Sequence, residues 1–503
     1  MDLELEVTPT PIFVDVVVVG AGLSGLRAAM ELQEAGCSFV VLEERPRVGG
    51  KTLSVEMEAG HGLKDVQGLD KIDLGASWIN STTQSEMYDL TQRFGLELVE
   101  QHVADSHLYQ RRNGTVDSFS TAFGHDIQSP AARLLYPRLD GYAASWLGPD
   151  DAPTFDQCDV QSLGRVNYPE DIQAADDAAQ FLTEAFLGID STSVSCLYMI
   201  NLIRSCGGLE TMSSSAPTGA QHLRIRQGAQ SLSHAMAASL PPSTLHLATK
   251  VSTITQRPGC GLLVTTTAPH TVFHCHRLIL ALPTTASSTI LFTPPLPPPK
   301  QTLIARTVTG FLAKCVLVFS SPWWRATGLS GAMDSLSPLG PVLFTRDTSD
   351  AEGRFHSLTC FLAGDRARAW VALDAKARRA AVLDHLTEVF GSQPGVWSVP
   401  EPVGVYEAAW AEGTVPVVAP DLLWAVSPVG VDTVMAGGEG LFGEDQAGVL
   451  AMPFELVHFA GAETADVWRG HMEGAVRSGV RAAREVVVAL KERDGVGGMK
   501  PSL

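Results

Sequence analysis

Apolar and polar residues near the start of the chain follow the pattern of a strand–helix–strand unit. Residues 14–19 are a nearly continuous apolar run, which is typical of a strand buried on both faces. The glycine-rich turn 20–25 follows, and it leads into a stretch with helical spacing at 26–35. Residues 38–42 form a second apolar run, closed by Glu43. This order predicts the opening of an α/β fold.

The hydrophobic period changes twice further along the chain. Between residues 85 and 215 the spacing is mainly helical, and around residues 245–282 it shortens to two, which predicts a meander of short strands. Strands and helices then alternate to about residue 400. Helices are expected at 86–94, 131–144, 171–186, 194–206 and 472–490, and strands at 245–255, 261–267, 278–282 and 457–460.

Two segments have the composition of connections. Residues 293–300 (Thr-Pro-Pro-Leu-Pro-Pro-Pro-Lys) are typical of a stiff polyproline linker. Residues 436–448 contain several glycines, which predict a mobile surface loop without chemistry. No internal repeat is evident along the chain.

Composition places the chain among well-packed globular proteins. Of its 503 residues, 45% are hydrophobic and 18% are charged. The length is enough for roughly two to four domains. The formal net charge of −19 would repel the phosphate backbone of a nucleic acid, so no nucleic-acid partner is expected.

The eight cysteines contain no C-x-x-C pair, so neither a disulfide framework nor a metal site is indicated. This usage fits a reduced compartment, and we expect a soluble, cytoplasmic protein. The N-terminus lacks the basic start of a signal peptide, and the first apolar run is too short to span a bilayer, so no membrane association is expected. The final Pro-Ser-Leu only faintly resembles a peroxisomal signal, because its middle residue is not basic.

The turn after the first strand satisfies the dinucleotide-binding pattern G-x-G-x-x-G between a buried strand and a helix. Gly20 allows the tight turn, Gly22 lets the backbone approach a pyrophosphate, and Gly25 lets helix and strand pack closely. The helix N-terminus offers N–H groups and a positive dipole to the diphosphate. Glu43 ends the second strand at the distance where a carboxylate accepts hydrogen bonds from ribose hydroxyls. The pattern predicts a dinucleotide site but does not separate FAD from NAD.

Residues 43–52 (Glu-Glu-Arg-Pro-Arg-Val-Gly-Gly-Lys-Thr) closely resemble the signature of the flavin amine oxidase family, in which an acid is followed by Arg-x-x-x-Gly-Gly-Arg. The resemblance implies FAD-binding roles for Arg45, Arg47, Gly50 and Lys51. Arg47 and Lys51 can neutralise a diphosphate, and the glycine lets the chain pass close to the isoalloxazine ring. Lys51 stands where the family usually has arginine, so bidentate contact is lost and charge is kept. The alternative is that these basic residues are solvated surface charge.

Residues 73–80 (Asp-Leu-Gly-Ala-Ser-Trp-Ile-Asn) resemble the family segment that passes under the flavin. This implies that Ala76, Ser77 and Trp78 contact the cofactor. Trp78 also lies where an aromatic residue borders the flavin, which makes it a candidate for the reaction site.

Two middle segments match the same family. Residues 219–232 resemble the segment that returns to the cofactor domain, and in it Gln221 matches a glutamine that lines the substrate cavity. Val251 matches a residue whose backbone meets the adenine. Residues 323–331 (Trp-Trp-Arg-Ala-Thr-Gly-Leu-Ser-Gly) resemble part of the substrate domain.

Residues 458–476 resemble the closing flavin motif of the family nearly residue for residue. A strand is expected to end at Gly461, and Glu463 is then placed to bind a sugar or ribityl hydroxyl of the cofactor. His471 and Met472 open the last helix, whose first N–H groups can point at the flavin edge where negative charge builds on reduction. The alternative is an ordinary capping acid and a core methionine.

The resemblance implies an FAD-binding, Rossmann-type domain of the GR2-like class, interleaved with a mixed α+β substrate-binding domain. The FAD domain is expected to comprise residues 10–86, 219–285 and 400–490. The substrate domain is expected to comprise residues 87–218 and 286–399.

Three departures from the family bear on mechanism. The monoamine oxidases attach FAD to a cysteine at the position of Thr414, so here the FAD is expected to be non-covalent. Their two cage tyrosines correspond to Val415 and His471, which leaves the aromatic cage incomplete. The lysine that reaches flavin N5 through water corresponds to Thr289, so fast reaction with oxygen is not assured.

The resemblance implies oxidative deamination of a small-molecule amine, with oxygen as the electron acceptor. Hydride transfer from a long aliphatic primary amine to flavin N5 would give an imine, which water converts to an aldehyde or ketone and ammonia, while reoxidation yields hydrogen peroxide. The candidate reaction-site residues are Trp78, Gln221, Thr289 and His471.

Several alternatives stay open at this point. A polyamine or L-amino-acid oxidase is the nearest, although the latter needs a cavity arginine that the sequence does not place. A flavin desaturase acting on carbon–carbon bonds or a non-catalytic flavoprotein would share the motifs. An NAD-dependent dehydrogenase would not need the second glycine motif or the closing motif. The sequence leaves the oligomeric state open, a homodimer included.

Overall fold

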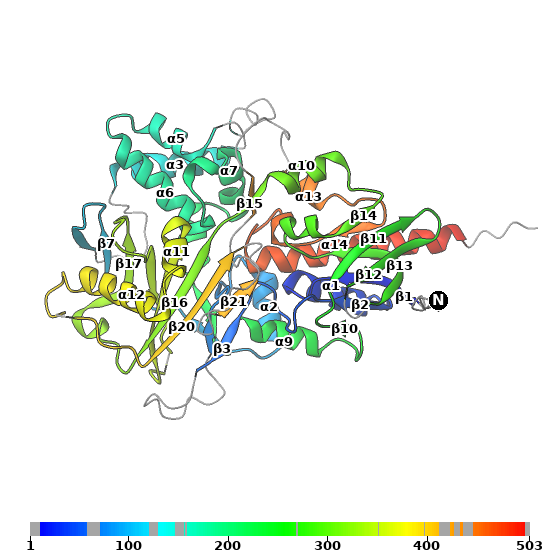
Figure 1. Cartoon of the computed structure of the whole chain (residues 1–503), viewed down its shortest axis with the longest axis horizontal. Coiled ribbons are helices and arrows are strands. Elements are labelled where there is room, and N and C mark those ends of the chain that lie inside the picture. Colours follow the sequence, from blue (N-terminus) through cyan, green and yellow to red (C-terminus); the bar gives the residue numbers. More distant parts are fainter. Residues whose placement is uncertain are drawn as a thin grey trace, which may run out of the picture. The chain divides into compact units, whose positions relative to one another are not determined.

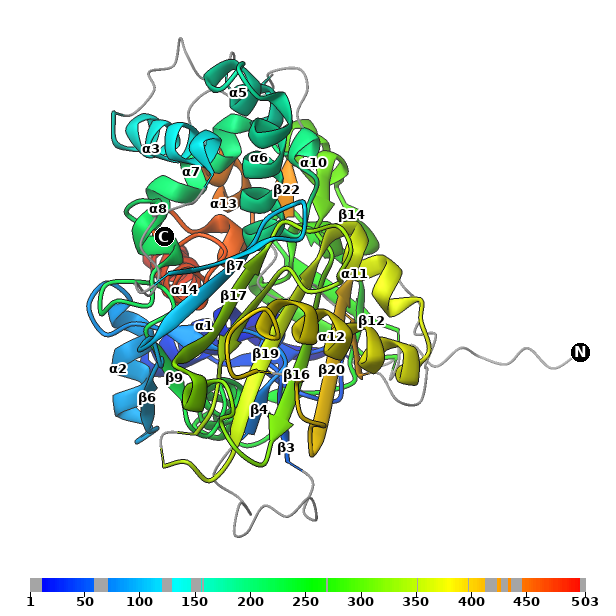
Figure 2. The same cartoon turned by 90° about the vertical axis from the view of Figure 1, so that its left-hand side faces the viewer.

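The computed structural model of the chain divides into two compact units, each assembled from separate stretches of sequence (Figures 1 and 2). Unit 1 comprises residues 1–50, 233–306 and 445–503, and unit 2 comprises residues 51–232 and 307–444. The predicted α/β class with two interleaved parts is confirmed. The structure describes residues 11–57, 71–119, 129–145, 155, 158–267, 270–350, 352–396, 398–411, 423–426, 433–435 and 446–497.

Unit 1 is built on an eight-stranded sheet with the order β10-β2-β1-β13-β12-β11-β14, in which β23 also pairs with β13. Strand β1 pairs in parallel with both β2 and β13, and its residues 16–19 are fully buried, as the apolar run predicted. The strands are β1 (Ile12–Val19), β2 (Phe39–Leu42), β10 (Leu245–His246), β11 (Val251–Arg257), β12 (Gly261–Thr266), β13 (Val272–Leu280), β14 (Leu291–Thr293) and β23 (Val457–Phe459).

Two long helices of unit 1, α1 (Leu23–Glu34) and α14 (Met472–Gly497), pack against each other (Figure 1). They approach so closely that a Cβ atom on Gly479 would lie 2.3 Å from the carbonyl oxygen of Ser24. The shorter elements nearby are α9 (Gln230–Ala238), η2 (Thr284–Thr289), α10 (Pro298–Arg306), α13 (Gln446–Ala451) and η4 (Ala462–Thr464).

Unit 2 is built on a second eight-stranded sheet, with the order β21-β20-β16-β19-β18-β17-β7-β8. One face of this sheet carries an apolar core that is covered by α11 (Gly364–Val371) and α12 (Ala375–Phe390), as Figure 2 shows. The strands are β7 (Ser106–Gln110), β8 (Val116–Phe119), β16 (Leu312–Phe319), β17 (Leu329–Ser335), β18 (Phe344–Asp347), β19 (His356–Ala363), β20 (Gly404–Ala411) and β21 (Leu423–Val426).

The rest of unit 2 contains a helical region and three small sheets. The four helices predicted between residues 85 and 215 are confirmed to within two residues at each end. The helical elements are α2 (Ser85–Arg93), α3 (Pro130–Ser145), α5 (Val160–Asn167), α6 (Ile172–Leu187), η1 (Ser191–Ser193), α7 (Cys196–Ser205), α8 (Leu209–Ser213) and η3 (Arg325–Thr327). The small sheets pair β3 (Ser54–Glu56) with β4 (Lys71–Asp73), β5 (Trp78–Ile79) and β6 (Leu98–Glu100) with β9 (Leu223–Ile225), and β15 (Thr307–Thr309) with β22 (Thr433–Met435).

Four local predictions need correction. The expected strand at 245–255 is two strands, β10 and β11, separated by residues 247–250. The expected strand at 278–282 covers only the buried end of β13, which begins at Val272 because its first half alternates buried and partly exposed residues. The polyproline linker is wrong for residues 298–300, which form the first turn of α10, where proline needs no backbone N–H. Residues 446–448 of the expected mobile loop belong to helix α13, and the rest of that loop lies outside the described residues.

The boundaries of the two units also differ from the expected domains. Residues 51–86 pack within unit 2, and so does strand β20, because β20 pairs with β16. Residues 286–306 pack within unit 1, because β14 pairs with β11. In the described part of the chain, no helix is both long and apolar enough to cross a lipid bilayer.

We predict that Gly479→Ala destabilises the packing of α1 against α14. The new methyl group would overlap the Ser24 carbonyl oxygen, and such overpacking costs about 1–3 kcal/mol. Thermal unfolding should show a lower Tm than that of the wild type. The matched control is Gly141→Ala in α3, where nothing lies within 4 Å of the added Cβ atom. An unchanged Tm for Gly479→Ala would contradict the close approach.

Candidate active site

The three glycines of the turn in unit 1 differ in whether the fold itself requires glycine at that position. A Cβ atom on Gly20 would lie 2.6 Å from the Ala281 oxygen, and one on Gly25 would lie 1.9 Å from the Gly20 oxygen. Both positions therefore need glycine for packing alone. A Cβ atom on Gly22 would meet only the Cα atom of Gly50, at an ordinary 3.8 Å. The fold does not require glycine at residue 22, so its missing side chain leaves room for a ligand.

This open position lies at the N-terminus of α1. Gly22 is the N-cap residue and supplies no side-chain hydrogen bond to the first turn of the helix. The positive end of the helix dipole and its first N–H groups are suited to an anionic group such as a diphosphate. The residues present therefore fit the dinucleotide that the sequence predicted.

Glu43 closes strand β2 and fixes the glycine turn. Its Oε2 accepts a hydrogen bond from the Ala21 N–H at 2.7 Å, and its Oε1 accepts one from the Arg45 N–H at 3.0 Å. The carboxylate thus stands beside the turn, as the sequence implied. Its predicted contact with a ribose stays a prediction, and so does the contact of Val251, which is buried at the start of β11.

Arg47 holds the loop that follows. Its Nη2 donates to the Gly50 oxygen at 2.9 Å and its Nη1 to the Val48 oxygen at 3.2 Å. Burial lowers the pKa of Arg47 to about 10, with a further lowering by the charge of Arg45, so the guanidinium stays charged at neutral pH. The alternative that Arg47 is only solvated surface charge does not fit these contacts.

The closing motif turns sharply before α14. Gly461 has a φ of 143° and donates its N–H to Ser478 Oγ at 3.0 Å, and Glu463 is buried. The Nδ1 atom of His471 lies 2.8 Å from the Arg469 oxygen, so Nδ1 carries the proton. The ring of His471 also meets Trp468 edge-on at 5.1 Å. Met472 is the first residue of α14, as expected; its side chain is buried, and its contact with the cofactor stays a prediction.

In unit 2, Lys314 of β16 secures the segment that the sequence placed under a flavin. Its Nζ donates to the Gly75 oxygen at 2.5 Å, to Ser77 Oγ at 2.9 Å and to the Asp73 oxygen at 3.4 Å. The side chain is only 6% exposed, and burial lowers its pKa to about 8. The sequence reasoning missed Lys314, although a lone charge within the apolar run of β16 was the available signal.

Aromatic rings continue along the same sheet face, opposite to α11 and α12. Phe344 and Phe361 are cross-strand partners whose rings stack at 4.3 Å, and Lys314 is the partner of Phe361 on the other side. The ring of Trp78 lies 5.7 Å from that of Phe361, and its Nε1 donates to Gln101 Oε1 at 2.9 Å. The result is an aromatic surface formed by Phe344, Phe361 and Trp78, largely buried within the protein and with a cation at its edge.

The predicted cavity residue Gln221 meets a charged group on this face. Arg346 of β18 donates from Nε to Gln221 Oε1 at 3.4 Å, and its guanidinium carbon lies 4.9 Å from the ring centroid of Phe344. Gln221 and Trp78 are therefore joined through Arg346 and the stacked Phe344–Phe361 pair. Sequence reasoning placed no arginine here, because only tertiary packing brings Arg346 of β18 close to Gln221, which precedes β9.

Three other predicted positions do not belong to the described part of unit 2. Thr289 is exposed in unit 1, at the end of η2, and its hydroxyl donates to the Ala286 oxygen at 2.8 Å. Thr414 and Val415 lie outside the described residues. Among the described residues, no group of three or more His, Cys, Asp or Glu side chains could hold a metal ion.

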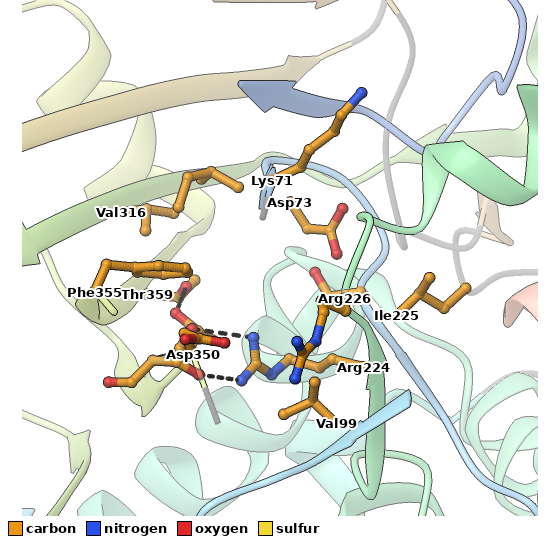
Figure 3. A pocket seen from close by; sticks show the side chains of 14 residues that line it. Lys71, Asp73, Val99, Arg224, Ile225, Arg226, Val316, Asp350, Phe355 and Thr359 are labelled. Atoms are coloured by element: carbon orange, nitrogen blue, oxygen red, sulfur yellow. Dashed lines mark hydrogen bonds between the residues drawn. The ribbon is translucent and has the colours of Figure 1, made fainter. Parts of the chain in front are cut away.

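A small polar cavity of about 30 Å³ lies beside the segment that Lys314 secures (Figure 3). Arg224 crosses it and donates to the Thr348 oxygen at 3.0 Å and the Ser349 oxygen at 2.7 Å, while Asp73 forms part of its wall. This volume has room for one or two water molecules, whereas ligand pockets hold about 300–1,000 Å³. The cavity is therefore no substrate site.

Comparison with known proteins agrees with this geometry. Residues 23–487 match the family model of the flavin-containing amine oxidoreductases. Flavin-containing amine oxidase B of Canis lupus familiaris is 29% identical over 486 residues, which cover 95% of this chain and 86% of that protein. The structure of cyclohexylamine oxidase from Brevibacterium oxydans IH-35A is similar with a TM-score of 0.80 and 26% identity, over 95% of this chain and 99% of that one.

A second solved structure is similar to the same extent. It is a triple mutant of putrescine oxidase with redesigned cofactor binding, with a TM-score of 0.80 and 25% identity. The match covers 95% of this chain and 100% of that one. Both solved structures thus share the fold over nearly their whole length.

We predict that Asp73 makes stability depend on pH in the acid range. Burial raises its pKa from 3.8 to about 6, so the folded state holds this proton more tightly than the unfolded chain does. The free energy of unfolding should therefore fall as pH rises from 3.8 to 6, by up to about 3 kcal/mol relative to Asp73→Asn. Denaturant unfolding at several pH values measures this difference.

The control for this experiment is Asp117→Asn. Asp117 forms an exposed ion pair with Arg111 and should leave the pH dependence of the wild type in place. If Asp73→Asn shows the same pH dependence as the wild type, Asp73 does not hold the proton.

Proposed function

This chain belongs to the flavin-containing amine oxidoreductase family, and we propose that it oxidises an aliphatic primary amine at a non-covalently bound FAD, with oxygen as the electron acceptor. It is an oxidoreductase that acts on amines. The observation that carries the proposed cofactor binding is the open position at Gly22, next to the uncapped N-terminus of α1.

The bound flavin supplies a two-electron acceptor for a hydride from the carbon next to the amine nitrogen. The contribution of the chain is to hold the substrate and to exclude water. Phe344, Phe361 and Trp78 offer an apolar surface for the carbon chain of the amine. Gln221 can donate or accept a hydrogen bond at the edge of this surface.

The charges on this face favour the neutral form of the amine. Lys314 and Arg346 are both buried cations that adjoin the aromatic surface. A nearby positive charge lowers the pKa of an amine, because it disfavours a second cation. The neutral amine has the nitrogen lone pair that hydride loss requires, so no protein base need remove a proton first. The imine product is then hydrolysed by water to a carbonyl compound and ammonia.

Two observations support an aliphatic substrate. The solved relatives are named for putrescine and for cyclohexylamine, both of which are aliphatic amines. The departures at Val415 and His471 remove the two cage tyrosines that the resemblance associates with the monoamine oxidases. A cage without them gives a flat aromatic amine less to stack on.

The test begins with the visible spectrum of the purified protein, followed by acid precipitation. A flavin spectrum with all the colour in the supernatant is the expected result, and colour in the pellet would overturn non-covalent binding. The same protein, kept without oxygen, should lose its flavin absorbance on addition of aliphatic amines such as hexylamine. If no amine on an aliphatic and aromatic panel bleaches the flavin, the proposed reaction is wrong.

We predict that Gly22→Ala weakens cofactor binding without destabilising the fold. The backbone at residue 22 (φ −77°, ψ −179°) is accessible to alanine, and the added Cβ meets no atom closer than 3.8 Å, so the protein should fold with a Tm near that of the wild type. The methyl group would occupy the approach to the diphosphate, and flavin affinity should fall roughly tenfold or more. Flavin content after gel filtration and the dissociation constant for added FAD measure this loss.

Gly141→Ala serves again as the control and should keep its flavin. Full retention of flavin by Gly22→Ala would show that no diphosphate approaches this position.

A further inference from the structure

Arg346 places a permanent positive charge on the sheet face that carries the aromatic surface. Arg346 is only 4% exposed, and its guanidinium lies over the ring of Phe344, which stacks on Phe361. Burial lowers the pKa of this guanidinium and the facing Asp334 carboxylate opposes that shift, so the group keeps its proton at neutral pH. Any substrate that lies against the two phenylalanine rings therefore comes close to this guanidinium, whose charge is partly balanced by Asp334.

The neighbouring carboxylate is shared between two partners. Oδ1 of Asp334 lies 3.4 Å from Arg346 Nη1, and Oδ2 lies 3.1 Å from His107 Nε2. These two partners hold the pKa of Asp334 below its usual range, so the carboxylate is ionised. Both oxygens of Asp334 are thus turned toward Arg346 and His107, and an incoming ammonium group would have to compete with these two contacts.

The guanidinium is held in orientation but keeps an exchangeable contact. Nη1 also donates to the Thr345 oxygen at 2.6 Å, a strong bond to its own strand. The bond from Nε to Gln221 Oε1 is long, at 3.4 Å. A guanidinium has five N–H donors in a planar fork, and a carboxylate accepts from such a fork more strongly than an amide oxygen does. A substrate carboxylate would therefore gain by replacing Gln221.

We propose that Arg346 determines substrate specificity by binding the carboxylate of an amine substrate, so that the enzyme prefers amino carboxylates to diamines and to plain alkylamines. The proposal rests on the proposed function, because it concerns the substrate of that same site. The reaction itself is unchanged: the amine carbon loses a hydride, and the carboxylate takes no part in the chemistry.

The opposite preference is expected of a site built for diamines. A second ammonium group would approach the Arg346 cation without a free carboxylate to receive it, and like charges repel strongly in a buried site. We therefore expect that this chain, although similar in fold to putrescine oxidase, does not prefer diamines.

The experiment compares three substrates of equal chain length on the flavin-loaded protein. Hexylamine, 1,6-diaminohexane and 6-aminohexanoate are each tested for the rate of anaerobic flavin reduction and for kcat/KM with oxygen. The wild type should rank 6-aminohexanoate first and the diamine last. In Arg346→Gln the ratio of kcat/KM for 6-aminohexanoate to that for hexylamine should fall roughly ten- to a hundredfold, as loss of a charge-assisted hydrogen bond predicts.

Two further variants separate specificity from structure. Arg346→Lys keeps the charge without the planar fork and should retain part of the preference for the carboxylate. Arg325→Gln is the matched control, because Arg325 also binds a buried aspartate, Asp347, through Nε at 2.7 Å, but belongs to η3. Its substrate ratio should equal that of the wild type. A wild type without preference for the carboxylate, or an unchanged ratio in Arg346→Gln, overturns the proposal.

A binding measurement on the wild type tests the role of Arg346 without turnover and without the Arg346→Gln variant, which could fail to fold. Hexanoate has the carboxylate but no amine, and it should perturb the flavin spectrum of the wild type and inhibit hexylamine oxidation competitively. Absence of both effects overturns the role of Arg346 even if Arg346→Gln does not fold. If no amine reduces the flavin, the proposed function has failed, and the hexanoate titration still decides whether Arg346 binds a carboxylate.

Discussion

The candidate site of unit 2 depends on one buried ammonium group, that of Lys314. Removing a lysine charge from water costs several kcal/mol unless acceptors replace the water. Here three acceptors come from one short segment, the oxygens of Asp73, Gly75 and Ser77. Because all three must converge on a single Nζ atom, the segment is held in one conformation against strand β16.

Neighbouring contacts fix the same segment from other directions. A Cβ atom on Gly75 would lie 2.4 Å from the Lys51 oxygen, so only glycine allows the backbone to pass here. Trp410 of β20 donates from Nε1 to the Leu74 oxygen at 2.9 Å. The central strands of the sheet thus position the backbone that the sequence associated with the flavin through these polar bonds, in addition to the apolar packing of Ile72 and Leu74 against Val316 and Trp410.

The two faces of this sheet have different roles: one stabilises the fold, and the other carries the candidate site. Residues of β16 alternate between them, so Cys315 and Leu317 point into the apolar core under α11 and α12, while Lys314 lies on the other face. The core face supplies the burial that drives folding. The opposite face can then hold buried charges, which would destabilise a sheet without such a core.

The sequence predicted the parts of the site that are local in the chain. The glycine turn, Glu43 and the start of α14 at Met472 are each defined by residues within a short motif, and their geometry follows from that motif. The helices between residues 85 and 215 were predictable for the same reason, because helical periodicity is a local property.

What the sequence could not predict depends on strand register. Phe344, Phe361 and Lys314 become neighbours only because β18, β19 and β16 pair in one register, and nothing within any single strand specifies that pairing. Arg346 and Gln221 are also far apart in the chain, and they meet only through tertiary packing. The unit boundaries differ from the expected domains for a related reason: β20 joins unit 2 through pairing across a long stretch of sequence.

The charges that organise this face also bear on the protonation of the substrate. Lys314 adjoins Phe361 and Arg346 adjoins Phe344, so an amine on the stacked rings lies between two cations. Two nearby positive charges lower the pKa of that amine and favour the neutral form that can lose a hydride. If the substrate brings a carboxylate, this group compensates the charge of Arg346, while the Lys314 ammonium stays hydrogen-bonded to Asp73, Gly75 and Ser77. The ammonium that holds the segment in place therefore continues to disfavour a protonated amine, whichever group occupies Arg346.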